Sequence, residues 1–292
     1  MKTNFPSSFA SINTWADENN VTMTEARVRL AQYAVLLAAA SSRTLSTILV
    51  LKGGNALDFV WQPNRSTRDL DFSIDLPGSD TPPNTDLLRE LFTPALNISG
   101  RTLGITLGIH RIEQQPPGPN RTFITYEMHI GYALPDDTRL RKRMENGLLS
   151  TKKIKVEMSV HELVCADEPI NVEGTHKLRV STIEDIVAEK LRALLQQPIR
   201  NRYRRQDLLD IAITFQLRSN LDKALVADFL LRKAQIRDVT VSRAAFHHPD
   251  VIDRARQGYE ELRSTTRYAF IPFELALQAL YELVNALNIP DR

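Results

Sequence analysis

Two neighbouring motifs decide the fold: Leu51-Lys-Gly-Gly-Asn55 and Arg65-Ser-Thr-Arg-Asp-Leu-Asp-Phe72. The Gly-Gly turn of the first motif follows the short apolar run 47–51, which we predict to be a buried strand. Asp69 and Asp71 of the second motif lie one residue apart in another short apolar run, also predicted to be a strand. Because residues i and i+2 of a strand point to the same face, we expect both carboxylates to project together toward the turn.

This pattern predicts metal-assisted chemistry on a nucleoside triphosphate. Two adjacent carboxylates are the hard oxygen ligands that Mg²⁺ prefers, so Asp69 and Asp71 are candidate metal ligands. Gly53 and Gly54 carry no side chains and would let a phosphate approach the backbone N–H groups of the turn. Thr67 would share the Asp69 face of a continuing strand, and we include it with the two glycines among the candidate nucleotide-binding residues.

A third carboxylate would complete a two-metal site of the kind used in phosphoryl transfer. Glu157 is the best candidate, because the alternating stretch 152–160 predicts a strand with Lys155, Glu157 and Ser159 on one face. A neighbouring strand could bring Glu157 beside the two aspartates. The alternative interpretation is a solvated Lys/Glu face, and an isolated Asp-x-Asp pair also occurs by chance in many proteins.

The composition indicates a globular protein of a reducing compartment. Of the 292 residues, 42% are hydrophobic and 25% charged, and the formal charge of +2 is too small to establish a nucleic-acid partner. The single cysteine, Cys165, excludes an internal disulfide framework. The stretch 1–20 has no signal-peptide core, and the apolar run 31–40 is too short to cross a membrane, so we expect a cytoplasmic protein.

The order of predicted elements defines an α+β fold in two domains. We predict an N-terminal α+β domain, 1–180, and a C-terminal helical domain, 181–292. In the first we expect helices at 22–42 (with Thr24 as N-cap), 55–61 and within 82–97, and strands at 47–51, 69–76, 102–113, 122–134 and 152–160, the third and fourth of which form an antiparallel pair. In the second we expect helices at 182–197, 204–217, 222–234 and 273–287.

The motifs together resemble those of the AbiEii/AbiGii nucleotidyltransferase toxins, within the DNA-polymerase-β-like nucleotidyltransferase superfamily. The resemblance rests on Lys52-Gly-Gly-Asn-Ala-Leu57, Arg65–Phe72, Lys155-Val-Glu157, Ser181–Ala193 with its central Lys190, and Arg205-Gln-Asp-Leu-Leu-Asp210. Two departures stand out: the superfamily often has Gly-Ser at the first turn, and Gln206 separates Arg205 from Asp207. The second departure leaves Asp210 open as an alternative to Asp207.

The resemblance implies a polymerase-β-like domain with a mixed sheet and flanking helices, and a helical domain that completes the active site. It implies that Asp69, Asp71 and Glu157 hold Mg²⁺, that Lys190 neutralises the triphosphate, and that Asp207 orients Lys190 or binds the nucleoside. It further implies a toxin of a bacterial toxin–antitoxin system, with an antitoxin encoded alongside and a role in abortive infection. Some such toxins add nucleotides to the 3′ acceptor end of tRNA, which inhibits translation and growth.

A basic run is compatible with an RNA acceptor. From Lys190 to Arg205 every charged residue is basic, and the run could follow an RNA backbone or form a solvated loop between two helices. Nucleotide transfer to a protein or a small molecule remains an alternative, as does nucleotide or RNA binding without turnover. His247 and His248 are adjacent histidines before a proline, which we interpret as a loop or helix start in preference to a metal site.

Overall fold

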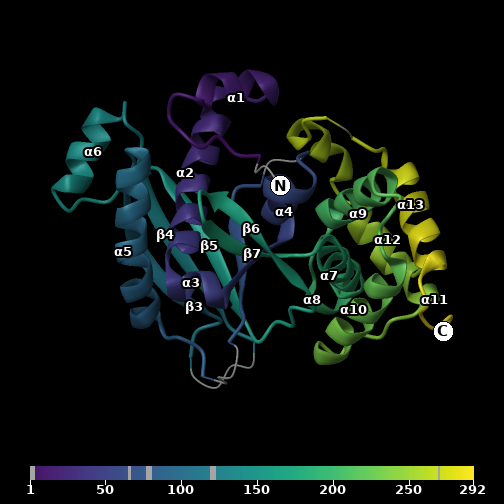
Figure 1. Ribbon diagram of the computed structural model, residues 1–292. Helices are drawn as coiled ribbons and strands as arrows, with labels where there is room; N and C mark the ends of the chain where they lie inside the picture. The colour runs from purple at the N-terminus through teal and green to yellow at the C-terminus, as the bar shows by residue number, and fades with distance from the viewer. Residues whose placement is uncertain (1–3, 65–66, 77–80, 119–122, 269) are drawn as a thin grey trace. The chain divides into compact units, whose positions relative to one another are not determined.

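The computed structural model describes residues 4–64, 67–76, 81–118, 123–268 and 270–292. Its chain divides into two compact units (Figure 1). The first contains Met1–Pro63, Thr67–Val164 and Glu168–Val180, and the second contains Asn64–Ser66, Cys165–Asp167 and Ser181–Arg292. Arg65 and Ser66 of the second sequence motif lie outside the described residues, as does part of the loop between the two strands predicted as an antiparallel pair.

A seven-stranded mixed sheet forms the centre of the first unit, in the order β3-β4-β5-β2-β1-β7-β6. β1 pairs with β7 and β2 pairs with β5 in parallel, whereas the pairs β1–β2, β3–β4 and β4–β5 are antiparallel. This confirms the predicted mixed sheet and the antiparallel pair. The strands are β1 (Leu49–Lys52), β2 (Leu70–Ile74), β3 (Thr106–Gln115), β4 (Thr125–Ala133), β5 (Lys153–Val160), β6 (Asp167–Glu173) and β7 (His176–Ser181).

Helices α2 and α5 pack side by side over one face of the sheet (Figure 1). Ile154, Val156 and Met158 of β5 are fully buried, while the side chains that alternate with them point to the opposite face and stay partly exposed. The polar face of the sheet is therefore the one available for chemistry. The helices of this unit are α1 (Ile12–Glu18), α2 (Met23–Ser41), α3 (Arg43–Ile48), α4 (Gly53–Ala56), the π-helix η1 (Leu57–Trp61), α5 (Thr85–Leu103) and α6 (Thr138–Glu145).

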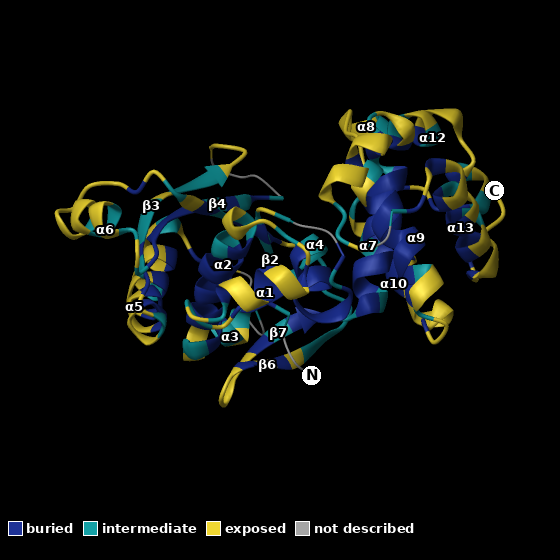
Figure 2. Cartoon of the chain, turned by 90° about the horizontal axis from the view of Figure 1, so that it is seen from above, coloured by how far each residue is buried: buried dark blue, intermediate teal, exposed yellow. Residues whose placement is uncertain are grey.

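The second unit is helical, and all four helices predicted there are present. Helix α7 packs against α9 and α10, and α9 packs against α13, so that much of α7 and α9 is buried (Figure 2). Within the described part of the chain, no helix has the length and hydrophobicity needed to cross a membrane. The helices are α7 (Ile183–Leu195), α8 (Gln197–Arg200), α9 (Arg205–Leu217), α10 (Lys223–Ile236), α11 (Arg243–Phe246), α12 (Pro249–Arg256), the 3₁₀-helix η2 (Tyr259–Thr265) and α13 (Phe273–Ala286).

The structure corrects two predictions of local structure near the first motif. The run 47–51 is not one strand, because helix α3 extends to Ile48 and β1 begins only at Leu49. The reason is capping, since the Ser42 side chain accepts a hydrogen bond from the Leu45 N–H and starts a helix there. Likewise Thr22, and not Thr24, caps α2 by accepting from the Glu25 N–H.

Candidate active site

Helix α4 follows β1 directly, and the Gly-Gly turn, Gly53 and Gly54, is the start of this helix and lies close to a carboxylate. Gly53 has φ of +67°, a left-handed conformation that favours glycine, and an ideal Cβ there would lie 3.0 Å from Oδ2 of Asp71. A side chain at this position would therefore be strained and crowded at once. The glycine allows the backbone of the turn to lie against the Asp71 carboxylate.

Three of the predicted site residues come together on the polar face of the sheet. Asp71 of β2 lies opposite Glu157 of the parallel neighbour β5, and Lys52 of β1 lies opposite Asp71 on the other side. Asp69 directly precedes β2, which begins at Leu70 and not at Asp69 as predicted. Asp71 and Glu157 thus belong to adjacent strands, although Glu157 is far along the chain, and Asp69 lies just before the strand that contains Asp71.

Thr67 lies before β2 and is not part of a continuing strand. The alternation that placed its side chain on the Asp69 face therefore does not apply to it. Its backbone carbonyl instead accepts hydrogen bonds from Arg29 and Gln32 of α2, at 2.9 and 3.0 Å.

Lys155 occupies the space among these carboxylates. Its Nζ lies 2.6 Å from Glu157 Oε1, 3.1 Å from Asp69 Oδ2 and 3.8 Å from Glu127 Oε2. Burial works against the charge of Lys155, but its hydrogen bonds to Glu157 and Asp69 outweigh it, so its pKa lies above the usual range. Lys155 therefore brings a positive charge to the place where these carboxylate oxygens converge.

The donor set fits a divalent cation. Asp69, Asp71 and Glu157 supply hard oxygen ligands, and the side chains of Asp69 and Glu157 are 42% and 36% exposed, which leaves them room to turn. The Lys155 ammonium lies between these carboxylates. Among the described residues, no group of three or more His, Cys, Asp or Glu side chains is already arranged to hold a metal. A metal bound here would compete with the lysine for the same oxygens.

Sequence reasoning missed Glu127 and His129, which extend the charged face onto β4. Glu127 lies opposite Glu157, and its Oε1 is 2.8 Å from Nε2 of the buried His129. Partial burial tends to raise the pKa of Glu127, yet the hydrogen bond with His129 and the charge of Lys155 leave it below the usual value. The alternation of Tyr126-Glu-Met-His-Ile130 could have indicated that Glu127 and His129 share one face of a strand. The sequence did not show that this strand lies beside β5.

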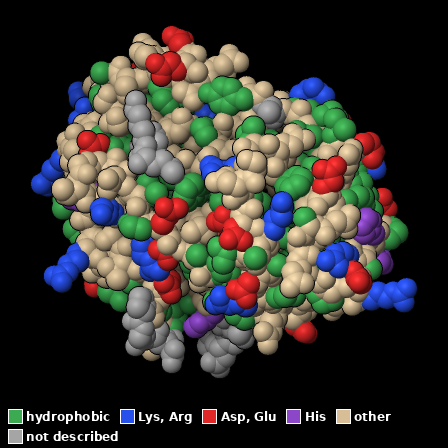
Figure 3. Space-filling view, turned by 45° about the vertical axis from the view of Figure 1, so that its right-hand side comes forward, with side chains coloured by type: hydrophobic (Ala, Val, Ile, Leu, Met, Phe, Trp, Pro, Cys, Tyr) green, Lys and Arg blue, Asp and Glu red, His purple; other side chains and the backbone are tan. Residues whose placement is uncertain are grey.

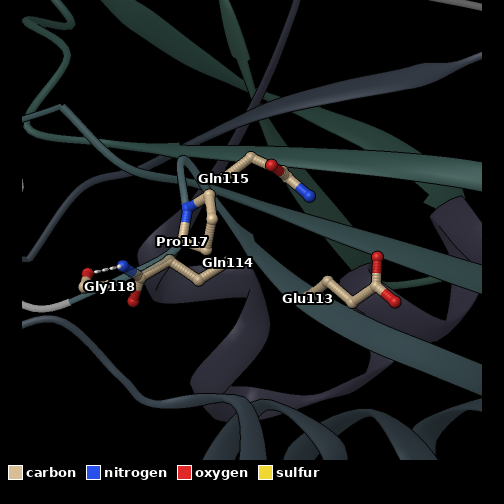
Figure 4. Close-up of a pocket in the computed structure, with 5 residues that line it drawn as sticks. All are labelled: Glu113, Gln114, Gln115, Pro117 and Gly118. Carbon is tan, nitrogen blue, oxygen red and sulfur yellow. Dashed lines mark hydrogen bonds between the residues drawn. The ribbon is translucent and has the colours of Figure 1, made fainter.

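A hollow of about 460 Å³ lies at the end of β3, away from Asp69, Asp71 and Glu157 (Figure 4). Glu113 lies opposite Glu127, and Glu127 lies opposite Glu157, so the hollow begins two strands from Glu157. Gln114 donates a hydrogen bond of 2.9 Å to the Gly118 carbonyl across this loop. The lining residues are Glu113, Gln114, Gln115, Pro117 and Gly118.

In the second unit, Lys190 is buried between two carboxylates. Its Nζ lies 2.7 Å from Asp207 Oδ1 and 2.9 Å from Asp210 Oδ2, which joins α7 to α9. The structure thus brings Asp69, Asp71 and Glu157 together in the first unit, and Lys190 and Asp207 together in the second. Asp210, left open as an alternative to Asp207, contacts the same lysine, so the contacts do not favour one aspartate over the other.

The basic run divides into buried and exposed parts. Arg192 is buried and paired with Glu189 at 2.6 Å, whereas Arg200, Arg202 and Arg204 are exposed around Tyr203. The Tyr203 ring is itself 53% exposed. On the face shown in Figure 3, acidic and basic side chains are interspersed, so a concentrated basic segment is a local feature.

Cys165 and the histidine pair have structural roles. Burial raises the pKa of the Cys165 thiol to about 11, which keeps it protonated at neutral pH. His248 is the N-cap of α12, where its Nδ1 accepts from the Asp250 N–H, as the helix-start interpretation expects. The His247 ring stacks on Tyr281 with centroids 4.0 Å apart.

Two solved structures share this fold. The first is a protein from H. pylori assigned as a nucleotidyltransferase, with a TM-score of 0.51, 15% identity and coverage of 91% of this chain and 95% of that one. The second is MenT4, a nucleotidyltransferase toxin from Mycobacterium tuberculosis H37Rv, with a TM-score of 0.51, 16% identity and coverage of 96% and 99%.

The profile of one protein family covers most of the chain. The AbiEii family, described as nucleotidyl transferase AbiEii toxin of a type IV toxin–antitoxin system, matches residues 35–279. The chain belongs to this family, which confirms the resemblance inferred from the motifs. No curated protein matches the sequence.

Proposed function

We propose that this protein is a Mg²⁺-dependent toxin that transfers a nucleoside monophosphate from an NTP to the 3′ acceptor end of tRNA. The acceptor hydroxyl gives its proton to a carboxylate of the site or to water, and its oxygen forms a bond to the α-phosphorus. The bond from that phosphorus to the bridging oxygen breaks, and pyrophosphate leaves with the bonding electrons. Loss of free tRNA 3′ ends would inhibit translation and growth, and so serve in abortive infection. A cognate antitoxin encoded alongside would oppose it in the cytoplasm.

The observation that carries the proposal is the pairing of Asp71 with Glu157 on adjacent strands, with Asp69 beside them. These three residues would hold Mg²⁺, which supplies neutralisation of the phosphate charge. Gly53 leaves room for the triphosphate next to the turn. Lys190 would neutralise a terminal phosphate, and Asp207 would orient Lys190. Both roles rest on the order of the sequence motifs.

The exposed arginines favour RNA as the acceptor over a protein or small molecule. Arg192 is buried, but three other arginines of the run are exposed: Arg200, Arg202 and Arg204. The exposed Tyr203 lies among them. Basic side chains with an interleaved aromatic ring suit a phosphate backbone with an unpaired base. The 3′ end of tRNA is such a single strand.

The test is incubation of the purified protein with each labelled NTP, Mg²⁺ and total RNA. We expect label at tRNA 3′ ends, and its loss to background in Asp69→Ala with unchanged circular dichroism. Glu113→Gln is the matched control, because it removes a carboxylate of the same sheet face two strands from Glu157. Transfer retained by Asp69→Ala would overturn the assignment of Asp69 as a metal ligand. Label on protein or on a small molecule would overturn tRNA as the acceptor. Binding of NTP or RNA without transfer would overturn the proposed enzymatic activity.

A further inference from the structure

We propose that Arg29 and Gln32 are positioning residues that hold the backbone leading into Asp69, and so set the geometry of the metal-binding carboxylates. This inference rests on the proposed function. Both residues lie on α2, before the residues that match the AbiEii family. Neither stands in a motif that the sequence singled out.

Arg29 is a buried side chain at the centre of a polar network. Its side chain is 1% exposed, and Nη1 donates to Gln32 Oε1 at 2.8 Å, to Asn55 Oδ1 at 2.9 Å and to the Thr67 carbonyl at 2.9 Å. Asn55 belongs to helix α4, directly after the Gly-Gly turn. One guanidinium therefore ties α2 to both sequence motifs of the candidate site.

The network holds three consecutive carbonyl groups just before β2. Gln32 Nε2 donates to the carbonyls of Thr67 and Arg68 at 3.0 and 2.9 Å, and Asn55 Nδ2 donates to the carbonyl of Asp69. Asp69 lies outside the strand, so the sheet ladder does not fix it as it fixes Asp71. Side chains of α2 and α4 hold the backbone of this segment instead, through the hydrogen bonds to its carbonyl groups.

The charge of Arg29 is balanced where water cannot reach it. Arg29 Nη2 lies 2.6 Å from Asp58 Oδ2, and both side chains are 1% exposed. The guanidinium also lies over the Phe5 ring, 4.8 Å from its centroid, and Phe5 is buried. A buried ion pair is costly to form and contributes little net stability, so its use here points to a need for fixed geometry.

The chain contains a matched control for a purely structural effect. In the second unit, Lys233 and Asp185 form an ion pair of 2.9 Å with side chains 4% and 5% exposed. Arg29→Met and Lys233→Met each remove the cation of a buried pair and leave an aspartate behind. Gln32→Leu is the second test variant, because it removes two donors and keeps the Arg29–Asp58 pair.

The experiment measures Mn²⁺ affinity by electron paramagnetic resonance, kcat, KM for NTP, and the melting temperature of each variant. We expect Arg29→Met and Gln32→Leu to bind Mn²⁺ about 10-fold or more weakly, as is typical when the support of a metal ligand is lost, with a similar fall in kcat. Lys233→Met should melt at a lower temperature with wild-type Mn²⁺ affinity. Amide hydrogen exchange at residues 67–71 should accelerate in Gln32→Leu and not in Lys233→Met.

Two results separate this inference from the proposed function. Unchanged exchange at 67–71 and wild-type Mn²⁺ affinity in Gln32→Leu would overturn the positioning role, whatever the protein transfers. A wild-type protein that neither binds Mn²⁺ nor transfers a nucleotide would overturn the proposed function, even if Gln32→Leu frees the 67–71 backbone.

Discussion

At the scale of single residues, Lys155 decides the charge balance of the candidate site. Its ammonium group pairs with Asp69 and Glu157 and lies 3.8 Å from Glu127. Carboxylates this close repel one another unless a cation stands between them. The lysine therefore stabilises the cluster in the metal-free protein and at the same time competes with a metal.

We predict that Lys155→Met lowers the melting temperature in EDTA by several degrees and that Mg²⁺ restores part of the loss. The reason is that the variant exposes unbalanced carboxylates, which a divalent cation can neutralise. The same variant should bind Mn²⁺ several-fold more tightly, measured by titration.

Lys153→Met is the control for this prediction, because Lys153 is an exposed residue of the same strand. Equal Mn²⁺ affinity in Lys155→Met and the wild-type protein would show that the lysine and the metal do not compete for the same oxygens.

Cys165 gives a prediction on pH. Burial raises the pKa of its thiol to about 11, above the ordinary value near 8.5, so the neutral thiol is favoured in the folded protein. We expect alkylation of the native protein by iodoacetamide to be slow at pH 8 and to accelerate only as the pH approaches 11. The urea-unfolded chain should react with a midpoint near 8.5, and a native rate equal to the unfolded one at pH 8 would contradict the burial effect.

At the scale of elements, the change from β1 to α4 depends on Gly53, the first residue of the helix. Gly147 is its matched control, because both have positive φ, +67° and +76°, but a Cβ at Gly147 would meet nothing within 4 Å. We predict that Gly147→Ala costs about 1 kcal/mol of unfolding free energy from its backbone alone. Gly53→Ala should cost more and should also reduce transfer, because its Cβ pushes on Asp71. Equal losses in urea unfolding would show that the contact with Asp71 has no cost.

The sequence predicted the elements with strong periodicity and missed those set by local or tertiary contacts. The alternation in 152–160 and the helical spacing in 182–197 were sufficient to predict β5 and α7. Strands β6 and β7 were missed because each has only two buried apolar residues, Ile170 and Val172 in β6 and Leu178 and Val180 in β7, which is too short an alternation to indicate a strand. The helix at 55–61 is present but starts at Gly53 and ends in a π-helix, a change that apolar spacing does not reveal.

For the candidate site, the sequence motifs named Asp69, Asp71 and Glu157, and strand alternation placed Glu157 on the polar face of β5. It could not show that Lys155 lies between them, since the pattern of 152–160 was equally typical of a solvated face. The burial of Arg29 could not be predicted either, because an arginine in an alanine-rich helix gives no indication that it is buried. Pairing partners across the sheet are a tertiary property that one sequence does not encode in any local pattern.

At the scale of the whole molecule, the exposed basic segment predicts a salt-dependent interaction. Replacing Arg200, Arg202 and Arg204 with glutamine should raise KM for RNA by about 10-fold or more and reduce the salt slope of RNA binding by about 2 to 3. The KM for NTP should stay unchanged. Binding is measured by fluorescence anisotropy across a salt series.

A second basic triplet serves as the control for that experiment. Arg139, Lys142 and Arg143 of α6 are also exposed, so their replacement with glutamine changes the net charge by the same amount. An equal loss of RNA affinity in both triple variants would show that only the overall charge matters.

The order of strands in the sheet has a consequence for synthesis of the protein. β2, with Asp71, emerges from the ribosome early, but the strand that completes its other edge is β5, which ends at Val160. A nascent chain that stops before Lys153 contains both aspartates and lacks both Glu157 and Lys155. Incomplete translation products that stop there therefore lack the Asp71–Glu157 pairing, and with it the paired edge on which the proposed chemistry depends.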